Sequence, residues 1–536
     1  METYNKPVSP LTRAKSVRTL IPATGLPRMA VHMSAAPPQD QTQILYPSLG
    51  AVSEAASYDE SKVADDERAE VPVSADQAWY MGLTALLGAG ALAATAAVVR
   101  YARRLRKSRS VPKLIGALDQ WAMASSTGDI PQGTLDKALK INLDTSTYGS
   151  IAEIGAGQEV GRIFFYVGAS AGTIAKTISA YDMTMSDTLY GDCDRFVTLQ
   201  RLEQMVDAEY EELEKTLRAE RPDTRFFAFA DTVVAKKYGQ DNECHGWMGL
   251  KFQLKPDSAP VRVLVHARLL DKTMQEQQNA LGILGTNLMH ACFYQLDGLL
   301  QPVGDGAGYG AFLKGLKDDL ADRIEVDFVQ CDGTDLEAVD QRAVGLQLVQ
   351  QGLVKAVTFT AAGDMTVPGD MLRKKAVVLT QDLDADVLPR AAEAVPASEE
   401  SRGVTALQDL ALSAFQGDGA APDAKATEAF LQRMDGLKAA GSAAILSNFA
   451  DYSDLATYLD RSTPEPKGVV MDAAAVAKFF AEDYTDREGG LLGYLGCVDK
   501  AGLKLMVNPS TDAVEVEEDV RPLYDYLIKN GTICSM

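Results

Sequence analysis

The sequence predicts an α/β protein with mostly parallel sheets, flanking helices and one transmembrane helix in front of them. Two observations lead to this prediction. Residues 78–99 contain no formal charge over 22 positions. From about residue 146 onward, short apolar runs alternate with longer runs whose apolar residues recur at helical spacing. That alternation is typical of Rossmann-like βαβ units.

Segment 78–99 has the length and the flanks of a membrane-spanning helix. At a rise of about 1.5 Å per residue, a helix of 22 residues covers a hydrocarbon core of about 30 Å. Trp79 and Tyr80 stand at its N-terminal end, and a basic run follows at 100–109. The preceding flank is acidic, so the positive-inside rule places the C-terminal side in the cytoplasm, stroma or matrix. Because alanine dominates the segment, a buried helix of a soluble domain is the alternative.

The residues before this segment resemble targeting and linking sequence. Residues 1–40 hold five basic and two acidic residues, many Ser, Thr, Pro and Ala, and no apolar core of a secretory signal. This composition predicts a transit peptide, with a disordered cytosolic tail as the alternative. Residues 41–77 are polar and acidic, and we expect them to be disordered. Together with the anchor they predict a single-pass protein of an organelle membrane, foremost a plastid thylakoid or envelope, with its body on the stromal side.

The rest of the chain divides into four parts. Residues 100–145 form a basic juxtamembrane and helical segment, residues 146–380 the main α/β domain, residues 381–425 an acidic linker, and residues 426–536 a second α/β segment. The expected strands of the two α/β parts are 225–230, 261–267, 324–330, 356–360, 376–380, 444–447, 468–471 and 503–508. A long helix is expected over 335–353.

Composition excludes several classes of function. The net charge of −22 argues against nucleic-acid binding, which needs a basic surface. The six cysteines are scattered without a CxxC pair, which indicates reduced thiols and neither a disulfide framework nor a zinc site. The chain has four histidines, so we expect no histidine-rich metal site.

A glycine-rich turn is the first candidate site. Gly155 and Gly157 follow the strand-like run SIAEI and precede a helix, the arrangement in which backbone amides hold a phosphate or an adenosyl group. Gly161 stands where a displaced third glycine would be, and Asp182 lies near the expected position of a ribose-binding acid. Glu159 places a negative charge beside any phosphate. These residues predict a nucleotide or S-adenosylmethionine site, and a tightly packed turn is the alternative.

The run DNECHGWMG supplies the candidate catalytic residues. His245 is the expected acid or base, with Glu243 as its neighbour, and a structural loop histidine is the alternative. A second candidate is Ser447-Asn448, which follows an apolar strand where open parallel sheets bind ligands. The loop 483–490 holds three acids and an arginine. Both of these places are also compatible with ordinary capping and turn chemistry.

Several longer runs resemble one known family. They include AEIGAGQEVGRIFF (152–165), ECHGWMGLKFQ (243–253) and AILSNFADYSDLATYL (444–459). In order, and over roughly 136–536, they are similar to a family of cyanobacterial, other bacterial and algal proteins. Its members are often labelled automatically as nicotinate- or nicotinamide-nucleotide adenylyltransferases or as TonB-dependent receptors. The resemblance leaves residues 1–110 outside, so the anchor looks like an addition to a complete α/β body.

Neither label agrees with the residues. The receptor label requires many alternating strands of about 10 residues, which the α/β pattern does not provide. The adenylyltransferase label implies an HxGH-type and an ISSTxxR-type motif, and both are absent. Three hypotheses follow: a membrane-tethered nucleotide-binding or nucleotidyltransferase-like enzyme, an S-adenosylmethionine-binding methyltransferase-like protein, and a non-catalytic scaffold or assembly factor that binds a membrane-protein partner.

Overall fold

The fold comes from a computed structural model. It describes residues 130–237, 242–300, 308–381, 387–395, 398, 400–415, 424–481, 484, 489–508 and 514–535. The expected targeting segment, acidic segment and transmembrane helix all lie outside these residues, as does most of 100–145. Within the described ranges, no helix is both long enough and apolar enough to cross a lipid bilayer.

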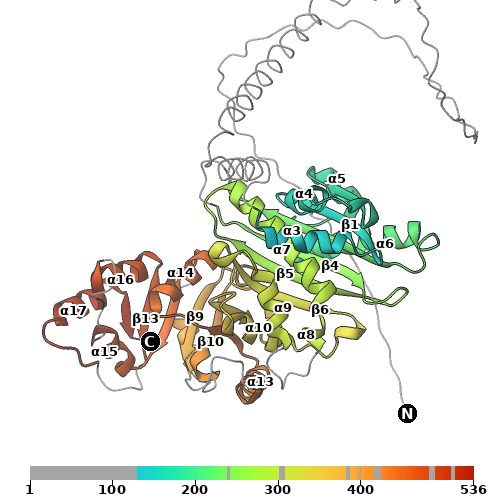
Figure 1. The fold of residues 1–536 in the computed structure, drawn as a ribbon. Coiled ribbons are helices and arrows are strands. Elements are labelled where there is room, and N and C mark those ends of the chain that lie inside the picture. Colours follow the sequence, from blue (N-terminus) through green and yellow to red (C-terminus); the bar gives the residue numbers. More distant parts are fainter. Residues whose placement is uncertain are drawn as a thin grey trace, which may run out of the picture. The chain divides into compact units, whose positions relative to one another are not determined.

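The first sheet has six strands in the order β2-β1-β3-β4-β5-β6 (Figure 1). They are β1 (Thr147–Ile154), β2 (Ile174–Ser179), β3 (Arg225–Val234), β4 (His245–Gln253), β5 (Pro260–Leu269) and β6 (Ile324–Asp332). β1 runs parallel to β2 and β3, whereas every neighbouring pair from β3 to β6 is antiparallel. This sheet is therefore mixed and not mostly parallel, because the connections between β3, β4 and β5 are too short for a crossover helix.

Helices cover both faces of this sheet. On one face, α7 (Met274–Tyr294) lies against α4 (Gln158–Tyr166), and α3 (Gln132–Asn142) lies beside them. α7 approaches closely at Gly285, where a Cβ would lie 2.6 Å from Val160 and 3.0 Å from Phe229. On the other face, Leu202 of α6 (Leu199–Leu217) packs over β4 at Gly249.

The second sheet has eight strands in the order β14-β13-β12-β9-β10-β11-β7-β8. They are β7 (Ala356–Phe359), β8 (Met365–Thr366), β9 (Ala376–Gln381), β10 (Val404–Ala411), β11 (Ala443–Ser447), β12 (Lys467–Met471), β13 (Leu503–Val507) and β14 (Ile533–Ser535). All strands from β14 to β11 are parallel, and only β7 and β8 are antiparallel to their neighbours. For this sheet the expectation of a mostly parallel arrangement is confirmed.

Helices also lie on both faces of the second sheet. Leu446 of β11 belongs to the apolar cluster that contains Phe430 of α13 (Ala424–Ala439). The next residue toward the N-terminus, Ile445, belongs to a different cluster with Leu455 of α14 (Tyr452–Ser462). The same cluster includes residues of α15 (Ala473–Ala481), α16 (Gly490–Lys500) and α17 (Arg521–Asn530). α13 and α14 thus cover opposite faces.

The expected linker at 381–425 needs correction. It supplies α12 (Val387–Ala394) and β10, and β10 lies between β9 and β11 inside the second sheet. The segment reads as a linker because β10 carries Gln408 and Asp409, which are polar. Both are nevertheless buried, and Asp409 accepts a hydrogen bond from Ser447 of β11. The second sheet therefore begins at β7, before the expected domain boundary.

The apolar runs expected to be strands all form strands in the structure. The helix expected over 335–353 is shorter than predicted, because α10 spans Gln341–Gln350 and a single 3-10 turn at Thr334–Leu336 precedes it. Asp340 is the N-cap of α10, and its side chain accepts a hydrogen bond from the backbone N–H of Arg342.

Substitution of Gly285 tests the close packing of α7. Gly285→Ala should lower the free energy of unfolding by about 1–3 kcal/mol, because the added methyl group has no space against Val160. Gly436→Ala in α13 is the matched control, since nothing lies within 4 Å of the added Cβ there. It should stabilise the protein by up to about 1 kcal/mol through helix propensity. Denaturant unfolding of both variants measures the difference, and equal effects would contradict the packing.

Candidate functional site

The glycine turn after β1 is closed by its own strands. Gly155 has a φ of +106°, and a Cβ on it would overlap the carbonyl oxygen of Val233 on β3. A Cβ on Gly157 would overlap both carboxyl oxygens of Asp231. The two glycines are thus required by close packing against β3, which explains them without a bound phosphate.

Two buried carboxyl groups occupy the place where a phosphate was expected. Glu153 of β1 and Asp231 of β3 lie directly opposite each other on neighbouring strands. Glu153 accepts hydrogen bonds from Gln158 at 3.0 Å, from Ser179 and from the backbone N–H of Gly157, at the start of α4. An anion at a helix N-terminus needs free amides, and here the protein's own carboxyl group takes one of them. The geometry therefore does not favour a nucleotide at this turn.

Burial controls the charge of this pair. It raises the pKa of Glu153 to about 7, against the lowering effect of the Gln158 and Gly157 hydrogen bonds. Burial, with the neighbouring Glu153, raises the pKa of Asp231 well above its ordinary value. Neither carboxyl oxygen of Asp231 has a hydrogen-bond partner within the described residues. Burial therefore favours the protonated form of Asp231.

The other residues predicted for this site have structural contacts. Glu159 forms an ion pair with Arg162, and its side chain packs against Gly282 of α7. Gly161 lies against Thr177, which a Cβ would approach to 3.2 Å. Asp182 caps α5 (Met183–Tyr190) by accepting a hydrogen bond from the N–H of Met185 at 3.0 Å. Packing and capping account for all three residues.

The predicted catalytic residue His245 belongs to a chain of hydrogen bonds across three strands. His245 Nδ1 lies 2.9 Å from His266 Nε2, and His266 Nδ1 lies 2.5 Å from Asp327 Oδ1. His245 starts β4, His266 lies on β5, and Asp327 lies on β6 at the register shift of a β-bulge. A bulge re-aims a side chain, and here it turns the Asp327 carboxylate toward His266.

The partners of each nitrogen fix the tautomers. The Asp327 carboxylate accepts a hydrogen bond, so His266 donates from Nδ1 and accepts at Nε2 from His245 Nδ1–H. This leaves His245 Nε2 as the atom that can exchange a proton with a ligand. Burial, with the neighbouring imidazole of His266, lowers the pKa of His245 to about 3, so this ring is neutral at physiological pH. The three residues can act as a proton relay, although neither cavity described below includes His245.

Glu243 has a different role from the one predicted. It forms an ion pair with Arg268 of β5 at 2.6 Å, and Arg268 also faces Glu325 of β6 at 3.7 Å. Arg461 of α14 reaches the same Glu325 at 3.4 Å. Glu243 thus belongs to an ion-pair network that joins the first sheet to α14. His266 and Asp327 were not among the predicted site residues. The signal that could have found them is a polar residue inside an apolar strand with a second polar residue two positions away, as in His266 with Arg268 and Asp327 with Glu325.

A cavity of about 390 Å³, here called the Ser447 cavity, lies at the carboxyl ends of β10 and β11. Asp409 and Ser447 form its floor, with the Ser447 hydroxyl donating to Asp409 at 2.7 Å. The walls come from the loop 448–451 and from α14, α15 and α16. The cavity contains the predicted pair Ser447-Asn448, and its volume suits a small ligand. Of the predicted loop 483–490, residues 483 and 485–488 lie outside the described part of the chain.

Polar and aromatic side chains share the lining of the Ser447 cavity. Among the described lining residues the polar ones are Asp409, Ser413, Ser447, Asn448, Asp451 and Lys478, and the aromatic ones are Phe449, Tyr452, Phe479 and Tyr494. Phe479 lies 5.1 Å from Tyr494 between ring centroids. Asp451 accepts hydrogen bonds from the backbone N–H groups of Ser453 and Asp454, which start α14. Those amides are therefore already bound.

Comparisons with known proteins add little to this geometry. No protein-family model matches the chain, and no curated protein matches it. The chain is similar to crystal structures of a competence/damage inducible protein, CihA, from Agrobacterium tumefaciens (17% identity, TM-score 0.24) and of a competence or damage-inducible protein from Enterobacter asburiae (10% identity, TM-score 0.23). Each match covers 30% of this chain and 96% of the other. Such low TM-scores carry no argument about this protein.

No metal centre is evident among the residues that the structure describes, because nowhere do three His, Cys, Asp or Glu side chains converge in a geometry that could hold an ion.

The neutral state of Asp231 makes stability depend on pH. The folded carboxyl group keeps its proton where the unfolded chain has released it, so its contribution to stability falls as the pH rises above about 4. Asp231→Asn cannot ionise, and we expect it to exceed the wild type in unfolding free energy at pH 8 by at least about 1 kcal/mol, with the gap narrowing toward pH 5. Urea unfolding at both pH values measures this.

Asp223→Asn, which changes an exposed carboxyl group, is the control and should leave the pH profile unchanged. A gap of the same size at both pH values would mean that Asp231 is ionised in the folded protein.

Proposed function

We propose that the protein binds a nucleoside or a nucleoside monophosphate in the Ser447 cavity. The observation that carries the proposal is the strand order of the second sheet. The chain forms β9, β10 and β11 side by side in one direction, returns to place β12 next to β9, and continues outward with β13 and β14. In doubly wound sheets of this order, ligands bind outside the carboxyl ends of the strands, near the reversal.

The cavity lies at the carboxyl ends of the strands, as this rule requires, and one strand away from the reversal between β9 and β12. Its floor lies at the carboxyl ends of β10 and β11, and α15, which directly follows β12, contributes Ala475, Lys478 and Phe479 to the wall. The cavity is therefore bounded by segments from both halves of the doubly wound sheet. This position supports Ser447-Asn448 as the ligand site, in preference to the glycine turn of the first sheet.

The lining supplies groups that suit a nucleoside. Asp409 and Asp451 offer carboxylate oxygens that can accept hydrogen bonds from ribose hydroxyls. Asn448 is exposed at the cavity and offers both a donor and an acceptor to the edge of a base. Aromatic rings such as Phe449 and Tyr452 offer the faces on which a base can stack.

The charges of the cavity limit the number of phosphates. Lys478 is the one cationic side chain among its described lining residues. The first amides of α14 are bound by Asp451, and Asp409 adds a second carboxylate nearby. A single phosphate can pair with Lys478, whereas a triphosphate would meet two carboxylates without further cations.

Calorimetric titration of the full chain with the four common nucleosides, their monophosphates, ATP, NAD and S-adenosylmethionine tests this proposal. We expect at least one nucleoside and its monophosphate to bind, and the triphosphate to bind more weakly. Asn448→Ala should weaken both by about tenfold, the loss of about one good hydrogen bond. Lys478→Gln should weaken the monophosphate and spare the nucleoside.

Two controls locate the site. Lys529→Gln removes an exposed lysine of α17 outside the cavity and should change nothing. Glu159→Gln changes the glycine turn, and an effect of this variant together with none from Asn448→Ala would place the ligand at the turn and contradict the proposal. If no member of the panel binds the folded chain, the nucleoside proposal is wrong, and a non-catalytic scaffold or assembly factor becomes the favoured hypothesis.

We also propose that residues 78–99 anchor this body to a membrane, with the basic run 100–109 on the same side as the α/β part. The support is the sequence alone: an uncharged segment of 22 residues with aromatic and basic flanks. The full chain should sediment with membranes and resist extraction by alkaline carbonate. Leu87→Arg places a charge near the middle of the segment at a cost of about 3 kcal/mol and should release the protein, whereas Leu87→Val should not. Release of the wild type by carbonate would contradict the anchor.

A further inference from the structure

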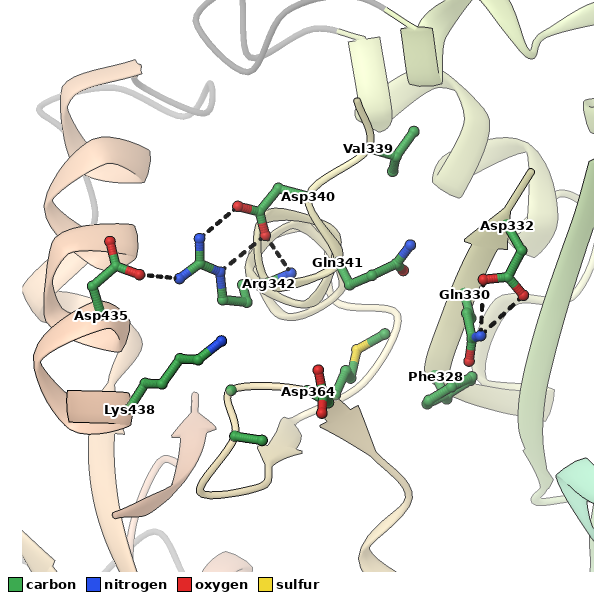
Figure 2. Close-up of a pocket in the computed structure, with 13 residues that line it drawn as sticks. Phe328, Gln330, Asp332, Val339, Asp340, Gln341, Arg342, Asp364, Asp435 and Lys438 are labelled. Atoms are coloured by element: carbon green, nitrogen blue, oxygen red, sulfur yellow. Dashed lines mark hydrogen bonds and ion pairs between the residues drawn. The ribbon is translucent and has the colours of Figure 1, made fainter. Parts of the chain in front are cut away.

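A second cavity, here called the Lys438 cavity, lies at the edge strand of the first sheet. Its volume is about 480 Å³, and four segments line it: β6, the start of α10, the turn between β7 and β8, and α13. Figure 2 shows their side chains around a common space, with Lys438 of α13 and Asp364 of the turn on one side and Gln330 and Asp332 of β6 on the other.

Most charges at this cavity are neutralised by neighbours. Arg342 lies between Asp340, at 2.8 Å, and Asp435, and it bonds to both (Figure 2). Asp332 accepts from Gln330 at 3.0 Å and faces Arg262 at 3.3 Å. The opposite charges within these groups neutralise each other, so these side chains shape the cavity wall and add little net charge to it.

Three polar groups at the cavity remain uncommitted within the described part of the chain. Lys438 has no ion-pair or hydrogen-bond partner there, and neither has the carboxylate of Asp364; both side chains are exposed. Gln341 donates from Nε2 to the carbonyl oxygen of Cys331 at 3.0 Å, but its Oε1 is buried without a partner. That oxygen has almost no accessible surface, so Lys438 and Asp364 are the two groups that a ligand in the cavity can reach.

The remaining lining is apolar. Phe328, Val339 and Met365 are buried residues whose side chains border the cavity. Phe328 is held in place by Trp247, with ring centroids 5.1 Å apart in an edge-to-face arrangement. Among its described lining residues, the cavity thus combines one uncommitted cation, one uncommitted anion and an apolar wall.

We propose that the Lys438 cavity binds a small zwitterion, namely a free α-amino acid with an apolar side chain. The ligand carboxylate pairs with Lys438, and the ligand ammonium group pairs with Asp364. The side chain lies against Phe328 and Met365. A ligand with two negative charges would meet Asp364 and Asp332, and a ligand with two positive charges would meet Lys438 and Arg342, so a zwitterion fits this set better than either.

Three ligands with the same branched side chain test the proposal: L-leucine, isopentylamine, which lacks the carboxylate, and isocaproate, which lacks the ammonium group. A thermal-shift screen of the full chain with all common L-amino acids comes first, and any better apolar binder replaces leucine in calorimetric titration. We expect the amino acid to bind at least about tenfold more tightly than either single-charge analogue, as expected when one charged hydrogen bond is lost.

Variants assign each charge to its partner. Lys438→Gln should reduce the affinity for the amino acid to that for the amine, and Asp364→Asn should reduce it to that for the carboxylate. Lys215→Gln and Asp223→Asn, which change exposed charges elsewhere, should have no effect. Unchanged thermal unfolding of the variants without ligand excludes misfolding as the cause.

The proposal is overturned if no amino acid binds saturably, or if the Lys438 and Asp364 variants bind as tightly as the two controls. Binding of the amine or the carboxylate alone with the affinity of the amino acid would also overturn it, since the cavity would then recognise a single charge. None of these outcomes depends on the nucleoside site, because the Ser447 cavity shares no lining residue with the Lys438 cavity.

Discussion

The buried carboxylate of Asp327 is the group on which the centre of this molecule depends. Asp327 is 1% exposed, and a charge so far from water costs several kcal/mol unless hydrogen bonds replace its hydration. His266 supplies the first of these bonds from Nδ1, and the bond that His245 donates to His266 Nε2 favours the same tautomer. Substitution of either histidine would therefore weaken the hydrogen bonding that stabilises the buried Asp327 carboxylate.

The surroundings of Asp327 also join the two sheets. Its second oxygen has no hydrogen-bond partner within the described residues, and neither has the buried hydroxyl of Tyr458, which lies on α14 of the second sheet. Burial, with the charge of Asp327, raises the pKa of Tyr458 above its ordinary value, so this hydroxyl stays neutral and can act as a donor. Beside them, Glu325 connects Arg268 of β5 with Arg461 of α14. A polar network of this kind fixes how α14 meets the first sheet, since a misplaced α14 would leave buried charges unpaired.

The two sheets differ at the carboxyl ends of their strands: the first sheet is closed there, and the second has a cavity. In the first sheet, Glu153 and Asp231 fill the edge, and the glycines of the turn allow the start of α4 to close over them. In the second sheet, the side chains at the ends of β10 and β11 are short, and a cavity remains between them and α14. The same strand-turn-helix pattern thus gives a sealed edge in one case and an open edge in the other. The neighbouring strand carries an aspartate in both sheets, so the difference lies in the strand before the turn, which carries Glu153 in the first sheet and the smaller Ser447 in the second.

This difference explains what could be predicted from the sequence. Runs such as VRVLVHA and AVVLT predict strands because a local pattern is sufficient, and β5 and β9 confirm them. The closure of the glycine turn could not be predicted, because it depends on Asp231, 76 positions beyond Gly155 in the chain, lying opposite Glu153. The relay was missed for the same reason: His245, His266 and Asp327 meet only through the pairing of three strands and a bulge. The Ser447-Asn448 pair could be singled out, because the end of a parallel strand is itself a local feature.

The unit β10-α13-β11 places both cavities on one part of the second sheet. Asp409 and Ser447 at the ends of its strands form the floor of the Ser447 cavity, on the face that α14 covers. Asp435 and Lys438 of α13 line the Lys438 cavity, on the opposite face. Phe430 and Leu437 bury α13 against this unit, so a substitution in its core would displace the walls of both cavities together. Substitutions of exposed lining residues such as Lys438 and Asn448 can affect one cavity without the other, because these side chains end at a cavity and support no packed residue behind them.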